Sequence, residues 1–260
     1  MKKYLVIGNP INHSLSPKLH NYWIKQNNLN AIYDKKKIDT DNIQEVVNEL
    51  KNDKINGANV TTPFKKSIIS FLDELTPLAN LAQSVNTIYK KNNKIIGDNT
   101  DIGGFEQALR HINYDVKNKK IFILGAGGVV PSIIIALKKL GVSKICLSNR
   151  TKEKTTILKK FYPSLKIIDW GSGCYFDMII NATILGLKNK DKIELDFSKI
   201  GKNKLFYDVI YNPGKTNFIL KGQELGNKTE NGKMMFIYQA QLAFKIWHNI
   251  LPKVHDKLLD

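Results

Sequence analysis

The stretch 120–151 reads KIFILGAGGVVPSIIIALKKLGVSKICLSNRT and combines two short strands, a glycine-rich turn and a helix. Residues 121–124 form an apolar run that predicts a buried strand, and residues 129–140 follow a helical pattern. Gly125, Ala126, Gly127 and Gly128 lie between them. A strand that leads through glycines into a helix binds the pyrophosphate of a dinucleotide, because backbone N–H groups and the helix dipole favour an anion. The segment therefore predicts a dinucleotide site.

The end of the second strand indicates which dinucleotide is bound. Residues 145–147 are followed by Ser148-Asn149-Arg150-Thr151, at the place where an acidic residue binds the ribose of NAD and an arginine accommodates the 2′-phosphate of NADP. Among 40 basic residues only Arg110 and Arg150 are arginine, so an arginine stands where a planar, bidentate phosphate ligand is useful. We therefore expect NADP; an ordinary exposed arginine at a strand end is the alternative interpretation. Val130 replaces the third glycine or alanine of the full motif, which makes the glycine motif alone less specific.

Composition sets the broad class of the protein. The chain has 260 residues, enough for one or two domains with large cores. No apolar run reaches about 18 residues, so no membrane span is expected, and the apolar residues 4–7 are too few for a signal peptide. Cys146 and Cys174 have no disulfide or metal-site spacing, so we expect no metal. These features predict a cytoplasmic protein.

The net charge of +17 raises the possibility of a nucleic-acid-binding protein. The lysines are spread along the whole chain, however, and no DNA- or RNA-binding motif is present. This pattern fits a lysine-rich coding bias better than a binding face. We therefore expect a small-molecule substrate and no nucleic acid or membrane partner, while a monomer and a homodimer both remain open.

Alternating strands and helices predict an α/β fold of two domains. Strands are expected at 4–8, 31–35, 57–60, 86–89 and 94–96, with helices at 17–26, 43–50 and from about residue 65. A helix at 101–112 precedes a second alternating set with strands at 121–124, 145–147, 166–168, 178–181 and 205–209. Such alternation implies mostly parallel sheets covered by helices, and two sheets in succession suggest two domains with a cleft between them.

The last predicted helix, 234–248, carries a polar residue on an apolar stripe. Met235, Leu242, Ala243 and Ile246 form the stripe, and Gln239 lies on it, whereas Gln241, Lys245 and His248 share the other face. A glutamine on an apolar face needs a hydrogen-bond partner. A backbone group and a bound ligand are equally good partners from the pattern alone.

Three segments of the first half are rich in small polar groups: residues 12–17, 59–65 and 97–101. All lie at or near the carboxyl ends of predicted strands, where open α/β sheets bind ligands. Two of their residues also have simpler interpretations. Ser16 precedes Pro17 and suits an N-cap, and Asp101 could cap the helix that follows it.

Together these residues resemble the shikimate dehydrogenase family, whose members are NADP-dependent enzymes of aromatic amino-acid biosynthesis. No single block is decisive, but the blocks occur in family order through nearly the whole chain. They are Gly8-Asn9-Pro10, Ser14-Leu15-Ser16-Pro17, residues 59–65, Ser84-Val85-Asn86-Thr87, residues 97–101, residues 125–128, Asn149-Arg150-Thr151, Asn181-Ala182-Thr183, Tyr211-Asn212-Pro213 and Gln239.

The resemblance implies an architecture and a reaction. An N-terminal α/β substrate domain with a mostly parallel sheet would comprise residues 1–100 and 233–260, and a Rossmann-type NADP-binding domain, residues 101–232, would be inserted into it. The reaction would be reversible hydride transfer between NADPH and the ring ketone of 3-dehydroshikimate, in the pathway to chorismate and the aromatic amino acids.

The resemblance also implies the role of individual residues. Lys65 and Asp101 would be the catalytic pair. Ser14 and Ser16 would bind the substrate carboxylate, with further substrate contacts from Asn59, Thr61, Asn86, Asp101, Tyr211 and Gln239. The cofactor would be bound by Gly125, Ala126, Gly127, Gly128, Asn149, Arg150, Thr151, Lys154, Thr183, Val209 and Gly232. Two departures from the family pattern are the run Val129-Val130-Pro131 after the glycine turn and Met234 near the nicotinamide end.

Three alternatives follow from the same sequence. A quinate/shikimate dehydrogenase that uses NAD is disfavoured by Arg150. A catalytically silent NADP-binding regulator is disfavoured by the presence of both Lys65 and Asp101. A nucleic-acid-binding protein is supported by net charge alone.

Overall fold

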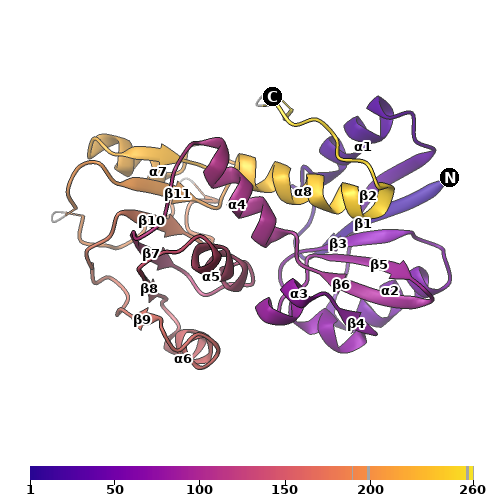
Figure 1. Cartoon of the computed structure of the whole chain (residues 1–260), viewed down its shortest axis with the longest axis horizontal. Coiled ribbons are helices and arrows are strands. Elements are labelled where there is room, and N and C mark those ends of the chain that lie inside the picture. The colour runs from indigo at the N-terminus through magenta and orange to yellow at the C-terminus, as the bar shows by residue number, and fades with distance from the viewer. Residues whose placement is uncertain (189, 198–199, 256–257, 260) are drawn as a thin grey trace. The chain divides into compact units, whose positions relative to one another are not determined.

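A computed structural model of the chain describes residues 1–188, 190–197, 200–255 and 258–259. It divides into two compact units, one formed by Met1–Phe105 with Ile237–Asp260 and the other by Glu106–Phe236. Each unit is built on its own sheet with helices packed against it (Figure 1). Helices α4 (Asp101–His111) and α8 (Lys233–His248) each contribute residues to both units.

The first unit contains a six-stranded sheet in the order β2-β1-β3-β5-β6-β4. Only β5 is antiparallel to its neighbours, β3 and β6, and the remaining described pairs are parallel. Because β5 lies between β3 and β6 and is antiparallel to both, β3 and β6 run in the same direction and their carboxyl ends lie at the same edge of the sheet. The elements are β1 (Lys2–Gly8), α1 (Ser16–Gln26), β2 (Ala31–Lys37), the 3₁₀ turn η1 (Thr40–Asn42), α2 (Ile43–Lys51), β3 (Gly57–Val60), the 3₁₀ turn η2 (Ser67–Phe71), β4 (Glu74–Leu75), α3 (Pro77–Ala82), β5 (Thr87–Lys91) and β6 (Lys94–Asp98).

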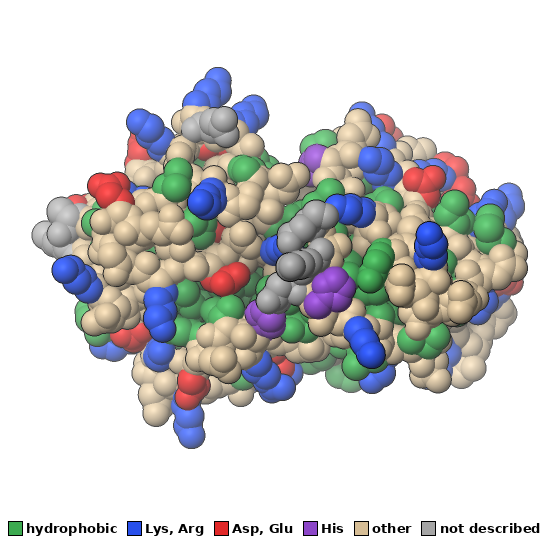
Figure 2. All heavy atoms as spheres, turned by 90° about the horizontal axis from the view of Figure 1, so that it is seen from above, with side chains coloured by type: hydrophobic (Ala, Val, Ile, Leu, Met, Phe, Trp, Pro, Cys, Tyr) green, Lys and Arg blue, Asp and Glu red, His purple; other side chains and the backbone are tan. Residues whose placement is uncertain are grey.

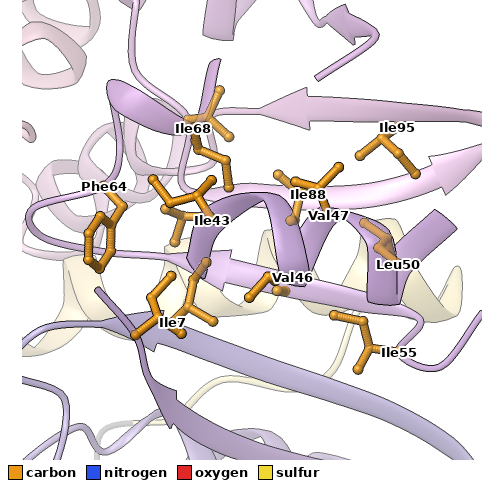
Figure 3. Packing of buried hydrophobic residues seen from close by; sticks show 14 of the residues in the cluster. Ile7, Ile43, Val46, Val47, Leu50, Ile55, Phe64, Ile68, Ile88 and Ile95 are labelled. Carbon is orange, nitrogen blue, oxygen red and sulfur yellow. The ribbon is translucent and has the colours of Figure 1, made fainter. Parts of the chain in front are cut away.

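One face of this sheet is covered by α2. The helix directs Ile43, Val46, Val47 and Leu50 toward the strands, a spacing of three and four residues that gives one apolar stripe (Figure 3). The strands supply residues from every second position, such as Ile7. Phe64 belongs to the same cluster, so the loop after β3 is anchored in the core.

The opposite face is covered by α1 and α8 through an aromatic layer. Tyr4 stacks on Trp247 with ring centroids 5.0 Å apart, and Trp23 meets Phe244 edge to face at 5.7 Å. Trp247 lies so close to the sheet that a Cβ on Gly57 would be 2.4 Å from its indole nitrogen. The layer therefore requires a glycine at that position of β3.

The second unit contains a six-stranded sheet, parallel in every described pair, in the order β12-β11-β10-β7-β8-β9. Counted from its first strand this is the order 3-2-1-4-5-6 of a Rossmann fold, whose ligand crevice lies where the order reverses, between β7 and β10. The elements are β7 (Lys120–Leu124), α5 (Val130–Lys139), β8 (Lys144–Ser148), α6 (Lys152–Phe161), β9 (Lys166–Ile167), β10 (Met178–Asn181), β11 (Leu205–Asp208), α7 (Asn217–Glu224) and β12 (Lys228–Glu230).

The predicted strands are present, most of them within two residues of the expected bounds, but the helix expected from residue 65 is wrong. That segment is a turn followed by the 3₁₀ turn η2. The Lys65 carbonyl accepts the backbone N–H of Val85 at 2.8 Å, and the Ile69 N–H donates to the Lys66 carbonyl three residues back at 3.2 Å. The segment therefore forms a 3₁₀ turn and not an α-helix.

Surface charge is distributed without a continuous basic face in the view of Figure 2, where lysines and arginines are scattered among acidic and uncharged side chains. The described residues include no helix with the length and apolar character needed to cross a membrane.

Candidate active site

The lysine after β3 and the first residue of α4 form an ion pair. Lys65 Nζ lies 2.6 Å from Asp101 Oδ2, and the two side chains are only 12% and 7% exposed. Lys65 is held from both sides, because Phe64 is buried in the core and the Lys65 carbonyl is bonded to Val85. The ammonium group is thus fixed in one place and directed at a carboxylate.

Asp101 is not the cap of α4, as its alternative interpretation required. It is the first helical residue, and Asn99 Oδ1 instead accepts the N–H of Ile102 at 3.2 Å. Both Asp101 oxygens are therefore available to side chains. Oδ2 accepts from Lys65, and Oδ1 accepts from Asn86 Nδ2 at 3.0 Å.

Asn86 connects the ion pair to the rest of the site. Its Oδ1 accepts the N–H of Thr100 at 2.8 Å, and its Nδ2 is within reach of Thr100 Oγ1, Asp101 Oδ1 and Gln239 Oε1, the last at 3.3 Å. The side chain is 2% exposed. The side-chain oxygen of Gln239 on α8 thus accepts a hydrogen bond from Asn86, another candidate site residue. The helical pattern of α8 did not indicate this partner.

The face of α8 that carries Gln241, Lys245 and His248 is partly buried. Gln241 is 7% exposed and donates to the Pro252 carbonyl at 2.7 Å. The C-terminal segment covers that side of the helix, which a helical period alone does not reveal.

Three more predicted residues lie at the carboxyl edge of the same sheet. Ile7 of β1 pairs with Val60 of β3, so the loops that follow these strands emerge side by side. A Cβ on Gly8 would lie 2.5 Å from Thr61 Cγ2, which shows how closely the loops approach. The first of these loops carries Ser14 and leads into Ser16 at the start of α1.

The prediction that Ser16 caps α1 is wrong. Ser16 is the first helical residue, and Leu15 occupies the N-cap position without a side-chain bond. The Ser14 hydroxyl accepts the Ser16 N–H at 3.3 Å instead. Ser16 is 5% exposed, so it is buried rather than at the surface.

Asn59 lies in a strand of the sheet and is bonded through both ends of its carboxamide within the first unit. It lies within β3, is 7% exposed, and donates from Nδ2 to the Asn86 carbonyl at 3.0 Å and to Thr87 Oγ1 at 3.1 Å. Its Oδ1 accepts the Tyr33 hydroxyl at 2.7 Å. The sequence assigned no role to Tyr33, because β2 reads only as a half-buried strand.

In the second unit, the glycine turn follows β7 as predicted. Gly125 has a φ of +108°, and a Cβ there would lie 2.7 Å from the Ala182 carbonyl oxygen, so glycine is required by conformation and by space. Gly127 and Gly128 are exposed, and α5 begins without a side-chain cap. The turn and the open helix end fit a dinucleotide pyrophosphate.

Other predicted cofactor residues surround the carboxyl ends of β10 and β11. Thr183 donates from its hydroxyl to Asn181 Oδ1 at 2.7 Å. The Val209 N–H donates to the Asn181 carbonyl at 2.9 Å, and a Cβ on Gly232 would lie 2.0 Å from the Val209 carbonyl oxygen. Glycine is thus the one residue type that fits at position 232.

A buried carboxylate supports this edge of the second sheet. Asp208 accepts from Asn181 Nδ2 at 3.0 Å and from the Thr216 hydroxyl at 2.5 Å. Burial raises the pKa of Asp208 to about 6, although the hydrogen bonds oppose the shift. The network fixes the loops from which Thr183 and Val209 arise.

The predicted phosphate-binding residues follow β8 and continue into α6. Asn149 donates from Nδ2 to the Thr151 carbonyl at 2.9 Å, which shapes the turn. Arg150 and Lys154 are exposed. Tyr211 also belongs to the second unit, where its ring stacks on Phe236 at 4.4 Å.

Known proteins match this chain along its length. Residues 6–88 match the family model described as the shikimate dehydrogenase substrate binding domain. The chain is 58% identical over 259 residues to the shikimate dehydrogenase (NADP(+)) of Pelagibacter ubique (strain HTCC1062), with 100% of this chain and 98% of that protein covered.

Solved structures agree. The structure of shikimate dehydrogenase from Aquifex aeolicus has a TM-score of 0.90 and 36% identity, covering 97% of this chain and 94% of that one. A shikimate 5-dehydrogenase from Thermus thermophilus, in complex with NADP(H) and shikimate, has a TM-score of 0.89 and 27% identity and covers 97% and 95%. The predicted α/β fold class and the family resemblance are both confirmed: the chain belongs to the shikimate dehydrogenase family.

Proposed function

We propose that Lys65 and Asp101 are the catalytic pair of this chain, which reduces 3-dehydroshikimate to shikimate reversibly with NADPH. The chain is an NADP-dependent oxidoreductase, as predicted, because its relatives are named for that activity. The observation that carries the assignment of the pair is their 2.6 Å contact in a largely buried position. An ion pair with a purely structural role is more often exposed on the surface.

The chemistry of a ketone reduction suits this pair. Bound NADPH supplies the hydride to the ring carbon. Negative charge then develops on the carbonyl oxygen, and the Lys65 ammonium is positioned to stabilise that charge and to donate the proton. The Asp101 carboxylate orients the ammonium group. In the reverse direction the neutral amine of Lys65 takes the proton from the substrate hydroxyl and becomes the ammonium again.

We also propose how the first unit binds the substrate. Ser14 and Ser16, in the loop after β1 and at the start of α1, suit a carboxylate, since a hydroxyl donates a hydrogen bond to an anion. Asn59, Thr61 and Asn86, together with Asp101 and Gln239, suit the ring hydroxyls. Both N–H groups of Asn59 are already bonded within the protein, so Asn59 is left to accept. Tyr211, in the second unit, is the remaining residue that the family resemblance implies for substrate binding.

The second unit is the proposed cofactor domain. The glycine turn and the N-terminus of α5 would hold the pyrophosphate, and Arg150 with Asn149, Thr151 and Lys154 would hold the 2′-phosphate. Thr183, Val209 and Gly232 lie at the adjoining strand ends of the same sheet. NADP rather than NAD is the cofactor named for the relatives.

Exchange of the lysine tests the catalytic assignment. Lys65→Ala should lower kcat by about 10²–10⁴, the usual contribution of a positioned acid or base. The KM for shikimate should change much less, because the interaction strengthens mainly in the transition state. Steady-state oxidation of shikimate by NADP⁺ measures both constants.

The neighbouring Lys66 provides the matched control, since its side chain is exposed. Lys66→Ala should retain the kcat of the unchanged chain. A Lys65→Ala protein that binds NADP, melts normally and keeps most of its kcat would contradict the assignment.

A further inference from the structure

A tyrosine outside the predicted site lies directly behind the candidate substrate residues. Tyr33 is at the centre of β2 and is 2% exposed. Its hydroxyl donates to Asn59 Oδ1 at 2.7 Å, within a buried region. Tyr33 pairs with Tyr4 of β1, and Val6 pairs with Asn59 of β3, so Tyr33 and Asn59 occupy the same face of the sheet, beneath α1 and α8.

The Tyr33 hydroxyl is the first donor of a chain of hydrogen bonds that runs in one direction. Asn59 Nδ2 donates to Thr87 Oγ1 at 3.1 Å, Thr87 donates to Asn86 Oδ1 at 3.1 Å, and Asn86 Nδ2 donates to Asp101 Oδ1 at 3.0 Å. The chain ends on a carboxylate, which only accepts. Since each bond polarises the next, the bonds reinforce one another.

This direction fixes which end of each carboxamide faces which neighbour. Asn59 donates both of its side-chain N–H groups within the protein, to the Asn86 carbonyl and to Thr87 Oγ1. Its oxygen has two lone pairs, and the Tyr33 hydroxyl occupies one of them. One lone pair remains, so a substrate hydroxyl that reaches Asn59 must donate to it.

The ring of Tyr33 has little freedom to turn. His20 of α1 stacks on it face to face, with ring centroids 4.1 Å apart and planes 4° from parallel. His20 is itself 1% exposed and is bordered by Trp23 and Trp247. The aromatic layer therefore aims the Tyr33 hydroxyl at Asn59.

We propose that Tyr33 is a positioning residue for the substrate. Its hydroxyl fixes the Asn59 carboxamide, and through Thr87 the Asn86 carboxamide, so that each presents the atom that the substrate requires. The proposal rests on the proposed role of Asn59 as a substrate ligand. Tyr33 itself touches neither substrate nor the reacting atoms.

The variant Tyr33→Phe removes only the hydroxyl. The KM for shikimate should rise roughly three- to tenfold, the effect expected for one net hydrogen bond. The kcat should stay within about twofold, because the variant leaves the contact between Lys65 Nζ and Asp101 Oδ2 in place. The KM for NADP⁺ should not change, because Tyr33 belongs to the first unit. A residue with a purely structural role would lower the melting temperature without this selective rise in one KM.

Tyr4→Phe is the matched control. Tyr4 lies in the same aromatic layer, also 2% exposed, but its ring packs on Trp247 and His248. The KM for shikimate should be unchanged in this variant. An equal rise of KM in both variants would show a general effect of loosening the layer and would overturn the proposal.

A double variant with Asn59→Ala tests the role of Tyr33 separately from the role of Asn59. If Tyr33 acts through Asn59, adding Tyr33→Phe to Asn59→Ala should not raise the KM for shikimate further. If the alanine variant does not fold, Asn59→Ser takes its place. Two outcomes would overturn the role of Tyr33 while leaving the proposed role of Asn59 intact. In one, the increases in KM of the two single variants multiply in the double variant. In the other, KM is unchanged in Tyr33→Phe but raised in Asn59→Ala. An unchanged KM in Asn59→Ala would remove Asn59 from the proposed substrate site, and the role of Tyr33 with it.

Discussion

Arg150 shows how much one residue type can indicate. It is one of two arginines among 40 basic residues, and it lies, exposed, immediately after β8 in a Rossmann fold. Lysine would supply the same charge, but only arginine offers two parallel N–H donors to a phosphate. The position of Arg150 and the chemistry of its side chain therefore both favour NADP over NAD.

Removal of this side chain should separate the two cofactors. Arg150→Ala should lower the affinity for NADP about ten- to a hundredfold, the equivalent of roughly 1.5–3 kcal/mol for charge-assisted hydrogen bonds. The affinity for NAD should hardly change, because NAD lacks the 2′-phosphate. Titration of protein fluorescence with each cofactor measures both. The other arginine, exposed on α4, gives the control Arg110→Ala; equal weakening for NADP and NAD in Arg150→Ala would mean that the effect is structural.

Predictability at the residue scale depended on whether a role is local in sequence. The glycine turn follows its strand directly, and Lys65 and Asp101 lie a few residues beyond strand ends, so their place at the edge of a sheet could be anticipated. The pairing of Lys65 with Asp101 was expected only from the family resemblance. Tyr33 and Thr87 could not be, because their importance comes from hydrogen bonds between strands that are distant in the chain. The alternative interpretation of Ser16 as a cap was wrong: a serine before a proline favours that position in general, whereas here Ser14 accepts the local N–H.

At the scale of elements, α4 and α8 approach each other closely in the first unit. A Cβ on Gly104 would lie 2.8 Å from both the backbone nitrogen and the Cβ of Gln239. Gly103, one residue earlier, would meet only Leu242 Cδ1, the end of a flexible side chain. The helices can therefore place Gln239 beside Asn86 only if position 104 has no side chain.

Two glycine substitutions test this contact. Gly104→Ala should destabilise the protein by about 1–3 kcal/mol through overpacking, more than the gain of up to about 1 kcal/mol in helix propensity. It should also raise the KM for shikimate, since Gln239 would be moved away from Asn86. Gly103→Ala gains the same propensity without a backbone clash and should be neutral or slightly stabilising. Melting curves and shikimate kinetics of the two proteins give the comparison; a Gly104→Ala protein as stable as Gly103→Ala would refute the account.

The elements themselves were largely predictable, and the exceptions have a common cause. Strands in the second unit are short apolar runs between helices, which periodicity identifies well. The expected helix after residue 65 was wrong, and the burial of Gln241 was not anticipated. In both cases a distant partner sets the local structure: Val85 binds the Lys65 carbonyl, and the segment at Pro252 covers Gln241. Local pattern carries no information about either partner.

At the scale of the whole molecule, the order of blocks along the chain predicted more than any single motif. The α/β class follows from alternation, and the observed order 3-2-1-4-5-6 of the second sheet, with the glycine turn after its first strand, agrees with the expected Rossmann-type domain. The strands 86–89 and 94–96 were expected, but the antiparallel direction of β5 in the first sheet was not predicted. The aromatic layer beneath α1 and α8 could not be predicted from the sequence, since its members come from four elements.

That layer should make the stability of the first unit depend on pH. Burial lowers the pKa of His20 to about 3, and the neighbouring His248, whose own pKa burial lowers to about 4, adds to the shift. Neither ring nitrogen of His20 has a hydrogen-bond partner among the described residues. The folded protein therefore holds His20 neutral at pH values where an unfolded chain, with a histidine pKa of about 6.5, takes up a proton.

The sign follows from proton binding. Below about pH 6.5 the unfolded state binds one proton more than the folded state at His20, so the free energy of unfolding falls as pH falls, by up to about 1.4 kcal/mol per pH unit until about pH 3. His20→Phe, which keeps an aromatic ring against Tyr33, should lose this contribution. Urea unfolding between pH 7 and 5, followed by the fluorescence of Trp23 and Trp247 in a Trp170→Phe background, measures the difference in slope between the two proteins. His13→Phe, at an exposed position, should keep the slope of the unchanged chain; parallel pH profiles for His20→Phe and that chain would show that His20 is charged in the folded state or does not control acid stability.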